Sequence, residues 1–207
     1  MSEPVSSGQY LAIAYDPFRG NPAKNDVILN GCVNLPNLFP LPGTAEERRV
    51  IIASWLTKPE HLFWEVWRGS DVIGILGLSR VIVGLDAVGH FAFFDRQLVG
   101  RRTLVVKMMR WAFEQLQLRR LSVEIPDHLD PLIRFCRAKL GFRYEGELQA
   151  GRHPKVLALE HERINGPARW VAKWGARREQ MHCGPDGVWH DLVCLRVLRE
   201  EFERLTE

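Results

Sequence analysis

The stretch DRQLVGRRTLVVKMMRWAFEQLQLRRLSVEIPDHLDPLIRFCRAKLGFRYEG, residues 95–146, decides the fold class of this chain. An acidic loop leads into Gly100 and two arginines, and apolar residues then recur at helical spacing over residues 103–116. Charged residues fall on the opposite face of that pattern. The spacing predicts an amphipathic helix that covers a sheet.

A short strand and a second helix follow the amphipathic helix. Apolar and polar residues alternate over 121–125, which is typical of a half-buried strand. Asp130 and Pro131 pair a favoured N-cap with a favoured first-turn proline, and Gly141 stands where a glycine ends a helix. We therefore expect a helix over 131–140.

The segment before this stretch predicts one helix and a three-stranded meander. Thr44, with Glu47 three residues on, forms a capping box before an apolar run that Pro59 closes. The turn-rich residues 68–71 separate two runs that favour strands, which indicates an antiparallel hairpin. The expected strands span 61–67, 72–79 and 87–94.

The two ends of the chain are less regular. Prolines cluster in residues 1–43, so long regular elements are not expected there, and only a short strand at 9–15 is predicted. Two further strands are expected, at 142–148 and 189–197. Between them, residues 152–186 form an insertion rich in Trp and Arg. Helices and a sheet of both strand directions predict an α+β (mixed α/β) fold.

The bulk composition fits one soluble globular domain over residues 1–207, with 46% hydrophobic residues. Lys and Arg number 28 against 25 Asp and Glu, a mild excess that does not by itself indicate nucleic acid. Four widely spaced cysteines and no N-terminal signal pattern predict a reduced, cytoplasmic protein. No apolar stretch approaches the ~20 residues that span a bilayer, and no metal-ligand spacing stands out.

The insertion carries Trp170 and Trp174 one helical turn apart, interleaved with basic residues. The favoured interpretation is a helix that packs on its own domain. A partner interface is a second option, and nucleotide stacking is the least favoured, so nucleic acid is not expected as a partner. A homodimer through the last strand or the Trp helix is left open.

Four segments in this order resemble the GNAT superfamily of acyltransferases. They are WAFEQL (111–116), KLGFRYEGEL (139–148), WHDLV (189–193) and LREEF (198–202). The match is to the branch of ribosomal-protein N-terminal alanine acetyltransferases and related resistance enzymes. It covers about residues 63–202 apart from the insertion, and its specificity comes from the order and spacing of the segments.

The resemblance implies a twisted, splayed mixed sheet flanked by helices, with acetyl-CoA as cosubstrate in the splay. The pantetheine arm would pair with strand backbone near Phe91 and Phe93. No metal is implied.

The family's phosphate loop reads Gln/Arg-x-x-Gly-x-Gly/Ala, and residues 97–102 of this chain read QLVGRR. Gln97 and Gly100 match, whereas Arg102 replaces a small residue. Arg102 either supplies charge-assisted hydrogen bonds to a diphosphate or fills the space. The resemblance implies cofactor binding by Gln97, Gly100, Arg101, Arg102, Thr103 and, at the start of the later helix, Asp130. A surface loop with solvated arginines is the alternative.

The catalytic set of the family is incomplete. Many members place a Glu on the strand before the loop and a Tyr on the helix before the Gly-Phe turn, and Arg137 stands at the Tyr position here. His90 is the titratable residue of the strand and the candidate base, because a His titrates near neutral pH. A packed structural role for His90, a base at Asp95 or Glu65, and proton relay through water are the alternatives.

Two functions compete for this sequence. The leading hypothesis is an acetyl-CoA-dependent N-acyltransferase that acts on a primary amine, either a protein N-terminus or a small molecule. The alternative is a catalytically degenerate GNAT-like scaffold that acts as a binding or structural protein, virion or host-directed, similar to divergent phage-encoded members. The Arg102, Ile133 and Arg137 departures and the Trp-rich insertion support the alternative.

Overall fold

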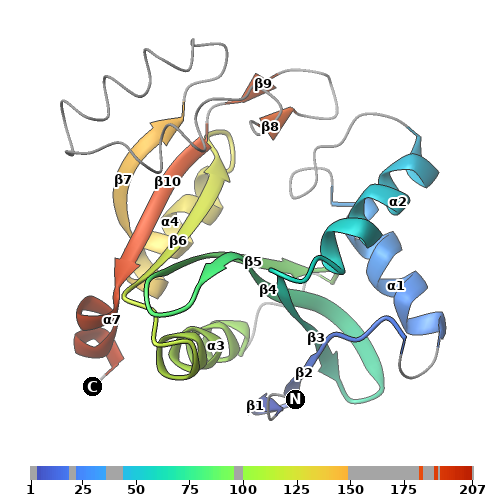
Figure 1. Cartoon of the computed structure of the whole chain (residues 1–207), viewed down its shortest axis with the longest axis horizontal. Coiled ribbons are helices and arrows are strands. Elements are labelled where there is room, and N and C mark those ends of the chain that lie inside the picture. The colour runs from blue at the N-terminus through green and yellow to red at the C-terminus, as the bar shows by residue number, and fades with distance from the viewer. Residues whose placement is uncertain are drawn as a thin grey trace.

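A computed structural model of the protein describes residues 4–18, 22–35, 44–95, 100–148, 182–183, 189–190 and 192–206. Within these residues the chain forms one eight-stranded sheet and one two-stranded sheet, with helices on both sides of the larger sheet (Figure 1). In chain order, the elements are β1 (Val5–Ser7), β2 (Tyr10–Ala14), α1 (Pro22–Val33), α2 (Ala45–Leu56), β3 (Leu62–Arg68), β4 (Asp71–Ile82), β5 (Asp86–Phe93), α3 (Arg101–Gln115), β6 (Arg120–Pro126), α4 (Asp130–Leu140), β7 (Arg143–Leu148), β8 (His182–Cys183), β9 (Trp189–His190), β10 (Leu192–Leu198) and α7 (Arg199–Thr206).

The large sheet has the strand order β1-β2-β3-β4-β5-β6-β10-β7. Strands β1 to β5 pair antiparallel in sequence, and the expected meander of β3, β4 and β5 is confirmed. Strand β6 is parallel to β5, because α3 returns the chain across the sheet, and β10 lies antiparallel between β6 and β7. The predicted mixed α/β class is therefore confirmed.

The sheet is splayed at its centre. Strands β5 and β6 pair through only three residue pairs, the last of which joins Val88 to Ser122. Beyond that pair, β5 continues to Phe93 in register with β4 alone, and β6 continues to Pro126 in register with β10. The two halves of the sheet consequently diverge from a common closed end (Figure 1). This splay is the feature that the GNAT resemblance implied.

Two apolar clusters hold the layers together. The larger lies between the sheet and α3, with members such as Leu104, Phe113 and Val123. The smaller lies on the opposite face, where α1 and α2 pack against β3 and β4 through residues such as Ile52 and Phe63. Burial of these side chains fixes which face of each strand looks toward α3 and which looks toward α1 and α2.

Local signals placed several helix ends correctly. The predicted capping box is present at α2, where Thr44 and Glu47 exchange side-chain and backbone hydrogen bonds. Gly141 ends α4 in the left-handed conformation with φ +78°, as expected of a C-terminal glycine. Helix α4 begins at Asp130, however, so the N-cap is Leu129 and the prediction of Asp130 as N-cap is wrong by one residue.

The expectation that residues 1–43 hold no long element is wrong. Helix α1 runs for 12 residues from Pro22 within this region. Its proline occupies the first position, where the missing N–H has no intrahelical partner to lose, and the rest of the helix contains no proline. Strand β1 was also not predicted. The late strand expected at 189–197 is divided into β9 and β10.

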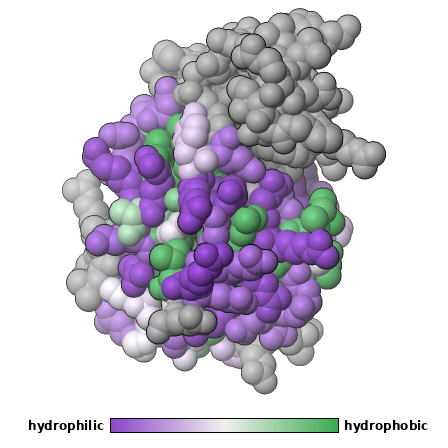
Figure 2. Space-filling model, turned by 90° about the vertical axis from the view of Figure 1, so that its left-hand side faces the viewer, coloured by the Kyte–Doolittle hydropathy of each residue, from purple (hydrophilic) through white to green (hydrophobic). Residues whose placement is uncertain are grey.

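Figure 2 shows the side of the molecule on which β7, β10 and α7 lie, and its described surface is mainly hydrophilic with separate hydrophobic spots. None of the described helices is long and apolar enough to cross a membrane. Trp170 and Trp174 of the predicted Trp helix lie outside the described residues, as does most of the 152–186 insertion.

Candidate active site at the sheet splay

His90 and Glu124 lie on opposite walls of the splay and on the same face of the sheet. Because Val88 pairs with Ser122, each of the two is two residues beyond the last pair that closes the splay. His90 packs against Trp55 of α2, so its side chain lies on the face that α1 and α2 cover. The strand neighbours of Glu124 face α3, so Glu124 points to the opposite face, as His90 does. The two walls therefore present an imidazole and a carboxylate at equivalent positions.

The imidazole of His90 is held by one hydrogen bond and a ring of aromatic side chains. Its Nε2 atom lies 2.7 Å from the Oγ atom of buried Ser79. The indole of Trp55 meets the ring edge-on at 5.0 Å, and Phe63 lies at 6.3 Å. Burial, followed by the charges of Arg80 and His61, lowers the pKa of His90 to about 3. The ring is therefore neutral at physiological pH, with one nitrogen that donates and one that accepts.

Glu124 on β6 is tied past β5 to β4, the middle strand of the meander. Nη2 of Arg80 donates to Oε2 of Glu124 at 2.7 Å, and the carboxylate side chain is 16% exposed. Arg80 reaches across because it sits at the irregularity of β4 between Ser79 and Ile82, with a φ of +52°. Glu124 was not among the predicted site residues, because only the register of β5 against β6 brings it opposite His90.

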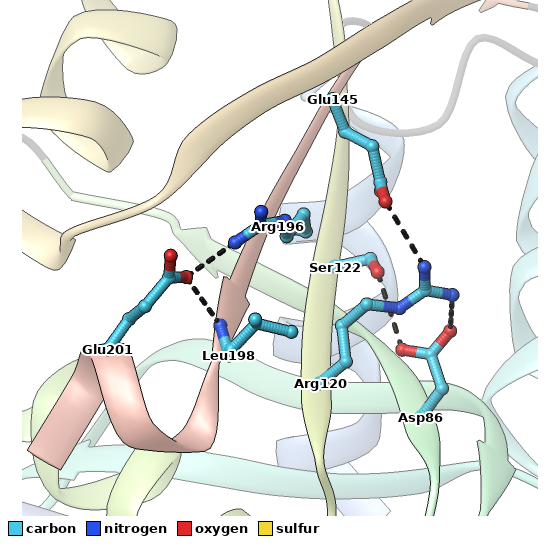
Figure 3. Close-up of polar contacts among 7 residues, drawn as sticks. All are labelled: Asp86, Arg120, Ser122, Glu145, Arg196, Leu198 and Glu201. Atoms are coloured by element: carbon cyan, nitrogen blue, oxygen red, sulfur yellow. Dashed lines mark hydrogen bonds and ion pairs between the residues drawn. The ribbon is translucent and has the colours of Figure 1, made fainter. Parts of the chain in front are cut away.

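A polar network clamps the closed end of the splay (Figure 3). Arg120 on β6 contacts the carboxylates of Asp86 on β5 and Glu145 on β7, and Ser122 donates to Asp86 at 3.3 Å. Burial lowers the pKa of Arg120, but the hydrogen bond and charge of Asp86, followed by Glu145, outweigh it and raise the pKa above its usual value. The guanidinium thus links three strands at the vertex from which the walls diverge.

A second polar contact fixes the junction of β10 and α7 (Figure 3). Glu201 accepts from the Arg196 side chain and from the Leu198 N–H, the latter at 3.0 Å. Burial alone would raise the pKa of Glu201, but these hydrogen bonds and the nearby arginines lower it. The contact holds the C-terminal helix at the end of the strand that supports β6.

A cavity of about 40 Å³ adjoins the splay on the α3 side of the sheet. Its walls come from β5 and β6 on both sides of the vertex, from β3 and β4 beneath, and from α3 above. Its lining residues include Gly89, Phe91, Val123, Met108, Ala112 and Trp64. The indole N–H of Trp64 is buried and has no hydrogen-bond partner among the described residues. Apart from Trp64 and His90, the lining residues are aliphatic, aromatic or glycine.

The first backbone N–H groups of α3 have no partner within the helix. Gly100 is the N-cap, with φ +81°, and the first intrahelical bond runs from the Leu104 N–H to the Gly100 carbonyl at 3.3 Å. The N–H groups of Arg101, Arg102 and Thr103 precede that bond and have no partner within the helix. A Cβ at Gly100 would lie 2.9 Å from the Tyr10 ring, so a glycine fits the site in both space and φ.

The two arginine side chains at this helix start have partners within the protein. Arg101 is buried, pairs with Asp95, and lies 4.5 Å over the Phe93 ring. Burial is the main cause that lowers the pKa of Arg101. Arg102 is exposed, and its Nε donates to the Lys139 carbonyl at 2.8 Å, near the end of α4. The Arg102 side chain thus bonds to protein backbone. Whether it contacts a diphosphate or only fills the space of a small residue stays a prediction.

Of the other predicted cofactor residues, two lie on β5, one lies on α4 and one is outside the described residues. Phe91 and Phe93 lie on β5 beyond the vertex, in register with Leu76 and Gly74 of β4. Asp130 is the exposed first residue of α4 and pairs with Arg134 at 3.0 Å. Gln97 lies outside the described residues. Gly100 to Thr103 are brought together at one helix end, whereas Asp130 stands on a different helix.

The two fallback bases are both engaged in ion pairs. Glu65 is 2% exposed, pairs with Lys24 of α1, and accepts from the Trp67 indole at 2.9 Å. Asp95 pairs with Arg101 and, at 2.8 Å, with Arg68. Glu124 is ion-paired as well, with Arg80, so its position opposite His90 across the splay is what makes it the stronger candidate for proton transfer.

The described residues fit a coenzyme A thioester. Among the described residues, no strand pairs with the outer edge of β5 beyond Val88, so an amide-containing arm could pair there. The first N–H groups of α3 have no partner within the helix, which suits them to a diphosphate. No group of three or more His, Cys, Asp or Glu in the described part of the chain could hold a metal ion.

Comparisons with known proteins agree with this geometry. No family model matches the sequence, and no curated protein matches it either. A protein of T. thermophilus described as an acetyltransferase superimposes with a TM-score of 0.66 and 18% identity, covering 99% of this chain and 94% of that one.

Two further solved structures give the same result. A Chromobacterium violaceum protein described as an acetyltransferase of the GNAT family gives a TM-score of 0.65 and 15% identity, covering 97% of this chain and 88% of that one. A mutant of spermidine N-acetyltransferase SpeG from Vibrio cholerae gives 0.63 and 14%, covering 96% and 99%. The chain therefore has the fold of the GNAT acetyltransferases.

Proposed function

We propose that this protein is an acetyl-CoA-dependent N-acyltransferase that acts on a primary amine. The observation that carries the proposal is the splay, where β5 parts from β6 after Val88, while the first N–H groups of α3 have no partner within the helix. Acetyl-CoA would supply an activated thioester at this place. The GNAT fold of the chain supports the same assignment.

The chain's own residues divide the binding task between backbone and helix end. The backbone of β5 around Phe91 and Phe93 would hold the pantetheine arm as an added strand. The N–H groups of Arg101 to Thr103 would hold the diphosphate, because a helix N-terminus favours negative charge. The arginine side chains would stabilise this helix start from behind, through Asp95 and the Lys139 carbonyl.

Acyl transfer requires that an amine lose a proton as it attacks the thioester carbon. His90 and Glu124 flank the splay and are the candidates to receive it. A pKa near 3 makes the imidazole a weak base, so we propose that Glu124 accepts the proton and that His90 positions the amine through a hydrogen bond. The Arg80 contact orients the Glu124 carboxylate.

The acceptor is proposed to be a small-molecule amine rather than a protein N-terminus. Several structural neighbours are described as spermidine N-acetyltransferases, and one is described as dodecameric. The assignment to the ribosomal-protein alanine acetyltransferase branch stays a prediction, and so does the homodimer. Both acceptor classes share a primary amine, which is the group that the two walls of the splay would receive.

The test measures acetyl transfer from acetyl-CoA to a panel of amines and N-terminal peptides, with the release of free thiol as the readout. The wild type should turn over at least one amine. Glu124→Gln should lower kcat about a hundredfold, as expected for loss of a general base, whereas His90→Gln should mainly raise KM. Absence of turnover with every amine, together with absent binding of coenzyme A, would contradict the proposal.

The scaffold alternative is supported by one observation. The Arg101 and Arg102 side chains are bonded to the protein, so neither side chain is directed to an anion in this structure. A scaffold would bind no coenzyme A, or would bind it without turnover of any amine. The two functions are therefore separated by the same titration and turnover measurements.

A further inference from the structure

We propose that the cavity beneath α3 receives the acyl chain of the thioester, and that the preferred chain is an aliphatic acyl group of about four carbons rather than acetyl. This inference rests on the proposed acyltransferase function and names its donor class. It concerns the α3 side of the splay. The His90 ring packs against Trp55 on the other face, although His90 is also one of the residues that line the cavity.

The cavity begins where the two central strands part. Gly89 and Val123 are the first residues beyond the Val88–Ser122 pair, and both line the cavity. A Cβ built on Gly89 would lie 3.5 Å from a Val123 methyl group, an ordinary contact that would occupy this mouth. The glycine thus leaves a passage from the splay to the interior at the place where a thioester would lie.

The interior of the cavity suits an alkyl chain. Met108, Met109 and Ala112 of α3 form one wall, and side chains of β3 and β4 form the other. A cavity of about 40 Å³ exceeds the ~10–15 Å³ needed for one water, but it lacks the several polar partners that hold a buried water. Methionine side chains adapt their shape easily, so this wall can widen around a chain.

Trp64, one of the residues that line the cavity, has an indole N–H without a hydrogen-bond partner among the described residues. Buried donors are nearly always paired in native structures, and one without a partner calls for an explanation. Trp64 is 2% exposed, and its ring packs against Trp111 at 4.8 Å rather than against an acceptor. The aliphatic chain offers this N–H no acceptor, and only the carbonyl oxygen of the acyl group could accept from it.

The reaction itself is unchanged by the longer chain. The amine nitrogen forms a bond to the acyl carbonyl carbon, and the carbon–sulfur bond breaks. Coenzyme A leaves with the sulfur. The sulfur takes up the proton that the amine loses, which gives the free thiol. The chain beyond the carbonyl takes no part, so chain length is read by the cavity alone.

The test is calorimetric titration of the full-length protein with free coenzyme A and with acetyl-, butyryl- and hexanoyl-CoA. Each buried methylene should tighten binding about fourfold, so butyryl-CoA should bind about fifteen times more tightly than acetyl-CoA. Ala112→Leu fills the cavity and should remove that gain while leaving free coenzyme A and acetyl-CoA unchanged. Ala138→Leu makes the same chemical change on the exposed face of α4 and should leave the whole series as in the wild type.

Ala112→Val makes a smaller addition at the same place and replaces Ala112→Leu if thermal unfolding shows that the latter is not folded. Equal affinities for acetyl- and butyryl-CoA in the wild type would overturn the inference, and so would a butyryl preference that survives both Ala112 variants. No binding of any of these ligands would overturn the acyltransferase function itself, which makes the two failures distinguishable.

Discussion

Acidification from pH 7 to pH 5 should destabilise this protein through His90. The folded-state pKa is about 3, whereas a histidine in the unfolded chain titrates near 6.5. In the window between these values the unfolded state binds one more proton than the folded state. Stability therefore rises with pH through the window and is lost as the pH falls below about 6.5.

The magnitude follows from the distance to the ordinary pKa. At pH 5, one and a half units at about 1.36 kcal/mol per unit give a loss of about 2 kcal/mol. Because the ring is only partly buried and water screens it, this is the upper end of the expected range. With a urea m-value of about 2 kcal/mol/M, the unfolding midpoint should fall by up to about 1 M.

The assay is urea unfolding of the wild type and His90→Gln at both pH values. Gln keeps a polar side chain that can bond to Ser79 but cannot titrate. The wild type should lose more than the variant over this interval, by up to about 2 kcal/mol. Equal losses in the two proteins would refute the low pKa and, with it, the neutral hydrogen-bonding role proposed for His90.

Two further predictions concern stability. Glu65→Gln should cost about 3 kcal/mol, because it leaves the largely buried Lys24 ammonium without its carboxylate, and the double variant Lys24→Met/Glu65→Leu should recover most of that loss in urea unfolding. Gly141→Ala should cost at least about 1 kcal/mol for its φ of +78° and should also displace Leu205, which a Cβ would meet at 2.1 Å. Gly69→Ala changes a glycine at φ +59° with open space around it, so its loss of stability measures the backbone strain alone. A smaller loss of stability at Gly141 than at Gly69 would contradict the contact with Leu205.

Local patterns in the sequence were sufficient for most of the helices and strands. The capping box at Thr44, the amphipathic spacing of α3 and the glycine at the end of α4 each depend on residues within one or two turns. Helix α1 was missed because the proline density of its surroundings outweighed a short proline-free run. A proline-rich region can therefore still contain a helix when the proline stands at the first helical position.

The site was less accessible to sequence reasoning, because it depends on pairing between distant segments. Glu124 becomes a candidate only when Val88 is known to pair with Ser122, which sets it opposite His90. Arg101 was expected at the diphosphate from its position in the loop, yet its side chain lies against Asp95 and Phe93. A basic residue in a motif does not reveal which acidic partner the fold brings to it.

The central claim is that the start of α3 binds the diphosphate of coenzyme A, and Thr103 tests it most directly. Thr103 is exposed in the first turn of the helix, where a Glu stabilises the helix but repels a bound anion. Thr103→Gln is the neutral control of the same size as Glu.

The measurement is calorimetric titration of coenzyme A into the wild type, Thr103→Glu and Thr103→Gln. The expected result is binding by the wild type and Thr103→Gln, with affinity at least about tenfold weaker in Thr103→Glu, since like charges at close range cost more than ~1.4 kcal/mol. Equal affinity in all three proteins would place the diphosphate elsewhere, and no binding to the wild type would contradict the proposed function.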